Sequence, residues 1–307
     1  MNINRRNFLK AAMLAGGSSF IGASKKALAE VDFANQANRC GVLTDLSRCI
    51  GCRACESACN EVNKLPEPDV PFDSDKVFEK ERRTTWKALT VVNRYPNPKD
   101  KDKPIFRKVQ CFHCNDPACA SACLVGALKK TPEGSVIYDE SVCLGCRYCM
   151  AACPFSIPAY EYSNPTTPKV VKCTMCYGRI TKGQVPGCVE ACPEEVHTFG
   201  KRNDLINLAR EKIIKNPGKY VDHIYGEQEV GGTSWLYLSP VPFEQVGFLT
   251  DVENKAYLNF TKGFLSVVPV VLTLWPALLG GIYIFTSSRD QKEKEELQKP
   301  KKGGTKS

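Results

Sequence analysis

The 307-residue sequence has few of the features on which a self-contained enzyme depends. It holds only three histidines, and nothing around His197 or His223 indicates a catalytic role. The sequence contains no recognisable nucleophile-and-base pair, phosphate-binding loop or dinucleotide fingerprint. Without such groups, we do not expect the chain to be an enzyme by itself.

Acidic side chains are absent from the first 29 residues, where five basic ones contribute to a formal net charge of +9. The end of the chain after residue 285 is also rich in lysine. Removing residues 1–29 would leave about +4, and metal-bound thiolates would lower the charge further. The positive net charge therefore does not indicate a nucleic-acid partner.

Cysteine, by contrast, is abundant, with 17 in the chain. A chain of this length can bury a core without disulfides, so metal binding is the better first explanation. Sixteen of the cysteines form four groups of four. The groups are Cys49, Cys52, Cys55 and Cys59; Cys111, Cys114, Cys119 and Cys123; Cys143, Cys146, Cys149 and Cys153; and Cys173, Cys176, Cys188 and Cys192.

The first and third groups have cysteines separated by two, two and three residues, and proline follows the third group in CLGCRYCMAACP. This is the bacterial ferredoxin spacing, in which three cysteines hold one cluster and the fourth reaches another. Structural zinc could account for the second and fourth groups, but not for triplets spaced by two. Disulfides within such triplets would be strained. The spacing therefore predicts iron–sulfur clusters.

Two further residues lie in or near these groups. Cys40 precedes the first group, and we expect a half-buried free thiol beside a strand. His113 lies inside the second group, whose four cysteines already suffice for a cluster. We therefore expect His113 to be a loop residue that tunes a sulfur by hydrogen bonding and does not bind iron.

Residues 1–29 have the three regions of an export signal. Arg5 and Arg6 lie in NRRNFLK, which resembles a twin-arginine signal, and a diluted apolar run leads to the small residues ALA at 27–29. A short amphipathic helix is the alternative. Because the twin-arginine route carries folded proteins, it would allow metal to be inserted in the reducing cytoplasm before export.

Residues 264–285 are uncharged and long enough to cross a bilayer core of about 30 Å. We expect one transmembrane helix there, in which Pro269 and Pro276 would kink the helix or free backbone carbonyls. A buried core helix is the alternative. The basic tail that follows favours a cytoplasmic C-terminus, and the export signal favours a periplasmic body.

The order of the four groups, the export signal and the single C-terminal span resemble a known family. It is the periplasmic ferredoxin-like, four-cluster electron-transfer subunit of hydrogenase-2-type nickel–iron hydrogenases, related to the β subunit of formate dehydrogenase. The stretch HIYGEQEVGGTSWLYLSPVPFE, residues 223–244, also resembles that subunit. The resemblance covers most of the chain, and it specifies the four-cluster family better than it specifies the catalytic partner.

The resemblance implies four [4Fe-4S] clusters, with groups one and four paired and groups two and three paired. The fourth cysteine of each group would then bind the cluster of its partner group. The implied ligand sets are Cys49, Cys52, Cys55 and Cys192 for cluster 1; Cys111, Cys114, Cys119 and Cys153 for cluster 2; Cys143, Cys146, Cys149 and Cys123 for cluster 3; and Cys173, Cys176, Cys188 and Cys59 for cluster 4.

The expected fold is α+β, with tandem two-cluster ferredoxin-like domains and a C-terminal transmembrane helix. Residues 87–95 and 135–139 have the composition of strands, 64–75 that of a surface loop, and 202–215 that of an amphipathic helix. The predicted organisation is a twin-arginine signal at 1–29, a four-cluster body at 38–200 with an insertion at 60–110, an extension at 201–262 leading to the membrane, a transmembrane helix at 264–285 and a basic cytoplasmic tail at 286–307.

The predicted function is that of a non-catalytic electron-transfer subunit. It would relay electrons between a periplasmic catalytic subunit, a nickel–iron hydrogenase by resemblance, and an integral membrane subunit that reacts with quinone. The alternative is the same relay in a molybdopterin oxidoreductase of the formate dehydrogenase type, or in a multihaem cytochrome complex. Either would operate at the periplasmic face of the inner membrane.

Overall fold

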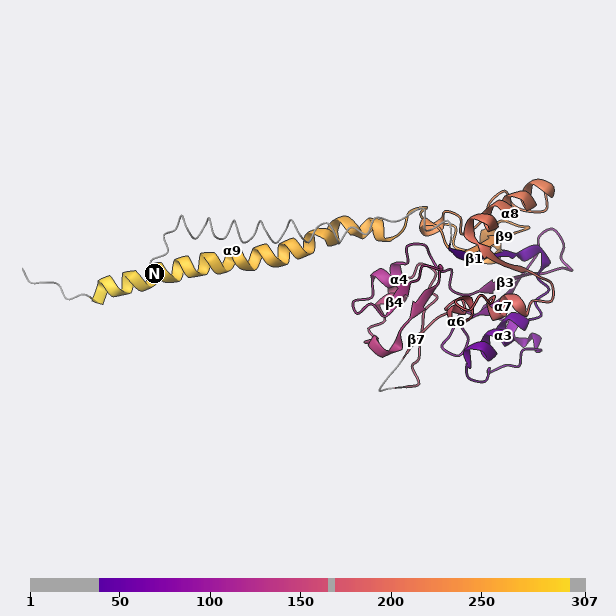
Figure 1. Ribbon diagram of the computed structural model, residues 1–307, viewed down its shortest axis with the longest axis horizontal. Coiled ribbons are helices and arrows are strands. Elements are labelled where there is room, and N and C mark those ends of the chain that lie inside the picture. Colours follow the sequence, from indigo (N-terminus) through magenta and orange to yellow (C-terminus); the bar gives the residue numbers. More distant parts are fainter. Residues whose placement is uncertain (1–38, 165–168, 299–307) are drawn as a thin grey trace, which may run out of the picture.

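A mixed α+β body and one long helix make up the part of the chain that the computed structural model describes, residues 39–164 and 169–298. The long helix, α9 (Leu258–Gln298), projects away from the body, as Figure 1 shows. The predicted export signal lies outside the described residues. The α+β class predicted from the sequence is confirmed.

The body is built on a three-stranded sheet in the order β8 (His197–Lys201), β1 (Cys40–Asp45), β9 (Trp235–Leu238). Strand β1 is antiparallel to β8 and parallel to β9. Both faces of the sheet are covered, because alternate residues enter different core clusters. On one face Leu43 packs with α8 (Arg202–Lys215), whereas Val42 faces an aromatic cluster.

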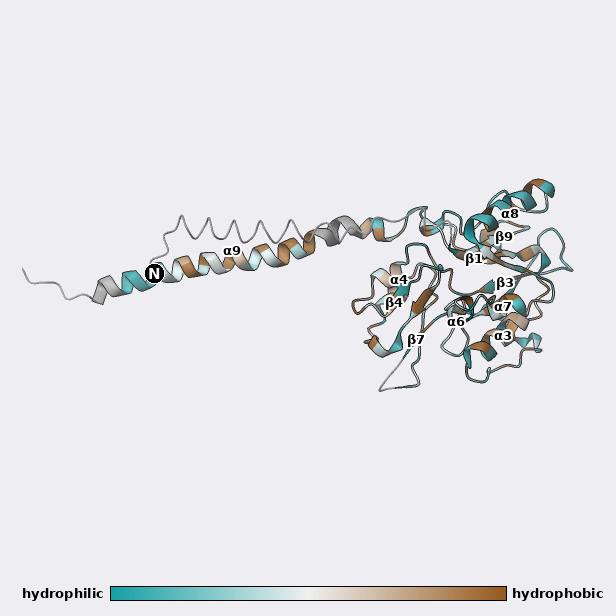
Figure 2. Cartoon of the chain, viewed as in Figure 1, coloured by the Kyte–Doolittle hydropathy of each residue, from teal (hydrophilic) through white to brown (hydrophobic). Residues whose placement is uncertain are grey.

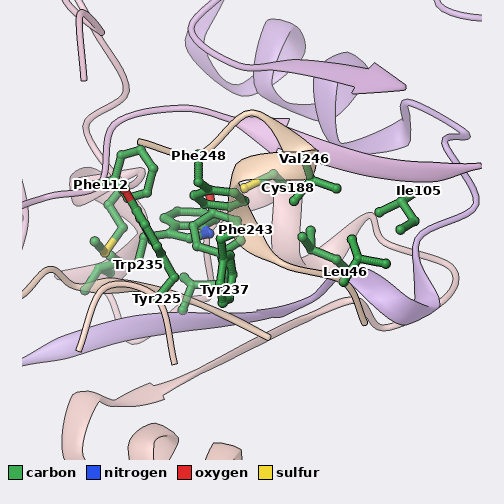
Figure 3. Close-up of a cluster of buried hydrophobic side chains, with 14 residues drawn as sticks. Leu46, Ile105, Phe112, Cys188, Tyr225, Trp235, Tyr237, Phe243, Val246 and Phe248 are labelled. Atoms are coloured by element: carbon green, nitrogen blue, oxygen red, sulfur yellow. The ribbon is translucent and has the colours of Figure 1, made fainter. Parts of the chain in front are cut away.

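The aromatic cluster fills the other face of the sheet and joins segments that are distant in sequence (Figure 3). Phe112 stacks on Phe155 with ring centroids 4.2 Å apart. It also meets Tyr237 at 5.7 Å and Tyr225 at 6.0 Å. Such pairs stabilise beyond the area they bury, by about 0.5–1.5 kcal/mol each. The region 225–248 is therefore part of the core, although the sequence predicts only an extension leading to the membrane.

Three short antiparallel ladders and a series of short helices surround this core. The ladders are β2 (Val91–Tyr95) with β3 (Ile105–Val109), β4 (Leu128–Lys130) with β5 (Val136–Tyr138), and β6 (Ala159–Tyr160) with β7 (Val170–Val171). The other α-helices are α3 (Ala54–Asn63), α4 (Ala118–Ser121), α5 (Tyr148–Ala152), α6 (Tyr177–Ile180) and α7 (Gly187–Glu190). The 3₁₀ turns are η1 (Leu46–Arg48), η2 (Asp75–Phe78), η3 (Glu140–Val142), η4 (Glu229–Gly231) and η5 (Phe243–Val246).

Helix α9 has the composition of a membrane span. An 18-residue window within its segment Val267–Lys294 has a mean hydropathy of 2.0, and none of that window is buried against the body. Hydrophobic residues follow one another along this part of the helix in Figure 2. The helix runs through both Pro269 and Pro276 and continues to Gln298, so the first part of the predicted tail is helical.

Candidate iron–sulfur centres

All 17 cysteines lie in the described part of the chain, and each is a free thiol. The helices that carry them pack in pairs: α3 of the first group contacts α7 of the fourth, and α4 of the second contacts α5 of the third. The fold therefore brings together groups one and four, which are more than 100 residues apart, and separately groups two and three. This is the pairing that the family resemblance implies.

Groups one and four line two small cavities. One contains Cys49, Cys52 and Cys55 of the first group together with Cys192. The second contains Cys59 of the first group together with Cys173, Cys176 and Cys188. Each cavity thus receives three cysteines from one group and the last cysteine of the other. These two sets of four are the ones that the family resemblance implies for clusters 1 and 4.

In groups two and three, too, the last cysteine of each group interacts electrostatically with thiols of the other group. Burial, together with the nearby thiols of Cys111 and Cys153, raises the pKa of Cys119 to about 12. Burial likewise raises the pKa of Cys149 to about 11, with a contribution from Cys123, Cys143 and Cys146. Cys153 thus lies near the thiols of group two, and Cys123 near those of group three.

Backbone geometry at the start of each group directs an N–H toward the first sulfur. The residue two positions after the first cysteine has a positive φ in all four groups, and only two of the four are glycine. Its N–H donates to the first thiol at 3.4 Å from His113, 3.4 Å from Gly145 and 3.3 Å from Met175. Gly51 makes the corresponding bond to Cys49. Such donors stabilise a thiolate and raise the reduction potential of the cluster it holds.

The last cysteine of each group also has a donor, supplied four residues later. Ala127 N–H donates to the sulfur of Cys123 at 3.1 Å, and Val196 N–H to that of Cys192 at 3.3 Å. Cys59 differs because it lies inside α3, where the backbone N–H groups serve the helix. The side-chain amide of Asn63 donates there instead, to the Cys59 carbonyl at 2.8 Å and the sulfur at 3.5 Å.

His113 is hydrogen-bonded to a sulfur, as predicted, but through its backbone N–H and not through its ring. Its Nδ1 accepts a hydrogen bond from the Val136 N–H at 2.9 Å, so the ring proton of the neutral form is on Nε2. Burial holds the pKa of His113 well below its usual range, and three nearby lysines lower it further. Only the backbone of His113, not its ring, donates to a sulfur in the described structure. Cys40 is a half-buried free thiol in β1, as predicted.

Three lysines near the cysteines, the buried Lys108 and Lys172 and the half-buried Lys130, were not singled out from the sequence. Among the described residues, Lys108, Lys130 and Lys172 have no carboxylate within salt-bridge distance. Lys130 donates to the carbonyls of His113 at 2.9 Å and Gly134 at 2.7 Å, and burial lowers its pKa to about 7. The sequence carries no periodic signal for such residues, because lysine normally lies at the surface.

The residues present fit iron–sulfur clusters. Buried neutral thiols with raised pKa values release their protons readily only to a strongly bound metal, and the N–H donors stabilise the resulting thiolates. In the described part of the chain, no three His, Cys, Asp or Glu side chains gather tightly enough to hold a single metal ion. Zinc would need its four sulfurs within about 3.8 Å of one another, because each Zn–S bond is about 2.3 Å. Four cysteines that line one cavity match the ligand number of a [4Fe-4S] cluster.

Comparison with known proteins gives the family. The profile of the 4Fe-4S dicluster domain matches residues 103–202. The chain is 50% identical to a protein of Nitratidesulfovibrio vulgaris over 296 residues, covering 96% of this chain and 80% of that protein. It is 37% identical to the hydrogenase-2 operon protein HybA of Escherichia coli over 282 residues, covering 80% of this chain and 83% of HybA. It is 36% identical to the formate dehydrogenase-O iron-sulfur subunit of the same species over 262 residues, 82% and 85% of the two chains.

The chain belongs to the family of HybA and the formate dehydrogenase iron-sulfur subunits. The resemblance found from the cysteine groups is thereby confirmed. As a member of the HybA and formate dehydrogenase family, the chain is an iron–sulfur electron-transfer subunit. The matched 4Fe-4S domain contains the last three cysteine groups, and the first group precedes it.

Proposed function

We propose that the chain holds four [4Fe-4S] clusters in the four predicted ligand sets. The observation that carries this proposal is the pair of cavities, each lined by four cysteines drawn three from one group and one from another. Interactions among the remaining eight thiols support the same arrangement for groups two and three. When bound, such clusters supply one-electron carriers, while the protein fixes their positions and potentials.

The proposed role is a relay between a periplasmic nickel–iron hydrogenase subunit and a membrane subunit that reacts with quinone. The similarity to HybA supports the hydrogenase, and the apolar helix α9 supports attachment to the membrane. In this arrangement the body lies at the periplasmic face of the inner membrane, and the C-terminus is cytoplasmic. The chain itself performs no substrate chemistry.

The second candidate is the same relay with a formate dehydrogenase. The chain is almost as similar to the formate dehydrogenase-O subunit, at 36% identity, as it is to HybA, at 37%. The identities do not separate the two catalytic partners, because the cysteine groups belong to the wider family. Co-purification separates them: a nickel–iron subunit bound to the chain supports the first candidate, and a molybdopterin subunit supports the second.

Iron and acid-labile sulfide analysis of the purified full-length chain tests the proposal directly. Four clusters require about sixteen irons and sixteen sulfides per chain, and reduction should produce the paramagnetic resonance signals of interacting [4Fe-4S] clusters. A content near eight irons would leave only two of the four sets occupied and contradict the proposal. A content near zero would exclude the relay altogether.

A further inference from the structure

Lys108 lies between the two cavities that groups one and four line. It is in strand β3, and its side chain is 2% exposed. The cavity of Cys49, Cys52, Cys55 and Cys192 and the cavity of Cys59, Cys173, Cys176 and Cys188 share only one lining residue, and that residue is Lys108. Among the residues that the structure describes, no other side chain lines both cavities.

The surroundings of Lys108 contain little negative charge apart from the thiols. Its ammonium is 3.2 Å from the amide oxygen of Gln110 and 4.4 Å from the centre of the Trp235 ring. Among the residues the structure describes, no carboxylate forms an ion pair with it. An unpaired buried cation is strongly destabilising, so Lys108 needs a counter-charge that the protein groups other than cysteine do not supply.

The thiols are the groups that can provide this counter-charge. Lys108 interacts electrostatically with Cys55 of the first set and with Cys59, Cys173 and Cys188 of the second. Lys130 and Lys172 differ because each ammonium group donates hydrogen bonds to backbone carbonyls, which satisfy it without a thiolate. Lys108 has one amide acceptor and an aromatic face, neither of which carries a full negative charge.

We propose that Lys108 is the shared counter-charge of clusters 1 and 4 and sets both of their reduction potentials. This proposal rests on the proposed function, because it requires both cavities to hold clusters. An electron that enters this pair adds one negative charge, which the ammonium stabilises in either cavity, and the charge is removed when the electron leaves. Lys108 keeps its proton throughout, so no bond to hydrogen is made or broken.

A redox titration of the full-length chain, followed by paramagnetic resonance, tests this role. In Lys108→Met, two of the four reduction steps should move to lower potential and the other two should stay in place. The expected shift is at least a tenfold change in each reduction equilibrium, which is 59 mV for one electron. Lys108→Arg keeps the positive charge and should move these steps much less. Lys103→Met, which removes an exposed lysine just before β3, should move none of them.

Iron and sulfide content, measured on every variant, distinguishes failure of this proposal from failure of the proposed function. Unchanged potentials in a fully loaded Lys108→Met protein would show that Lys108 is not the counter-charge. Too little iron in the unaltered protein would instead contradict the four-cluster assignment. If Lys108→Met and Lys108→Gln both lose iron while Lys108→Arg retains it, the need for positive charge is supported. Loss of iron from all three variants would mean that the lysine side chain is needed for its shape, which overturns the proposal.

Discussion

Glu56, the residue after Cys55, is a buried carboxylate that ties helix α3 to its surroundings. It forms ion pairs with Arg53 at 3.1 Å and Arg82 at 2.6 Å, and it accepts the Val92 N–H at 2.6 Å. We expect Glu56→Ala to destabilise the body by roughly 3–5 kcal/mol, because two guanidinium groups lose their counter-charge. Unfolding in guanidinium chloride, followed by the absorbance of the clusters, would measure this loss, and the variant should lose its absorbance at a lower denaturant concentration than the unaltered protein.

The matched control is Glu61→Ala, which removes an exposed carboxylate from the same helix. It should change the free energy of unfolding by no more than about 0.5 kcal/mol relative to the unaltered protein. An equal loss of stability in both variants would contradict the importance of the buried pairs.

His223 gives the body a stability that depends on pH. Its Nε2 is 2.5 Å from Glu229, and this hydrogen bond raises the pKa of His223 above its ordinary value of about 6.5. The stabilisation that His223 gives the folded state is therefore complete below about pH 6.5, and it is lost as the pH rises through the raised pKa of His223. Thermal unfolding at several pH values between about 6 and 9 should show a decline that His223→Gln lacks. Parallel pH curves for the two proteins would rule this contribution out.

Among individual residues, the sequence predicts the cysteine groups but not the side chains that surround them. Regular spacing identifies the thiols because ligand geometry constrains the local chain. Lys108 could not be found in this way, since its position depends on how β3 packs between groups that are distant in sequence. The partner of the His113 ring could not be found for the same reason, because Val136 lies in the ladder of β4 and β5.

Helix α9 can be tested as a membrane anchor by placing a charge in it. Leu272 is an exposed apolar residue inside the segment Val267–Lys294. Leu272→Arg should disfavour insertion by roughly 2.5–3.5 kcal/mol, because a charge near the bilayer centre is costly. Alkaline extraction of membranes should then release more of the protein. Ser288→Arg, near the end of the same segment, should have little effect, and equal release of both variants would count against a span centred on Leu272.

Elements with strong local patterns are the ones that the sequence predicts well. Residues 202–215 form α8 with the predicted bounds, because apolar residues recur at helical spacing. Strand β9 was not predicted, although WLYL is typical of a strand. Its place in the central sheet depends on parallel pairing with β1, almost 200 residues earlier, and local sequence carries no signal for such a partner.

For the whole molecule, the relay predicts that every cluster is needed. In the assembled complex, Cys146→Ser should damage one cluster, lower the iron content and stop electron transfer to quinone. The catalytic subunit should still reduce an artificial dye, because its own site is intact. Cys40→Ser is the matched control: this free thiol belongs to none of the four sets, and its removal should leave both activities unchanged. Unaltered quinone reduction in Cys146→Ser would exclude an obligatory path through that cluster.

The pairing of β1 with β9 also determines when the body can be completed during synthesis. Strand β1 is made early, but β8 and β9, which flank it in the sheet, are completed only at Lys201 and Leu238. At ordinary translation speeds of 5–20 residues per second, β1 waits roughly 10–40 s for its last partner. The predicted export signal, residues 1–29, ends ten residues before this strand. A signal at this position would therefore be attached to an unpaired strand in an unfinished chain, and to a completed sheet only after Leu238 has been made.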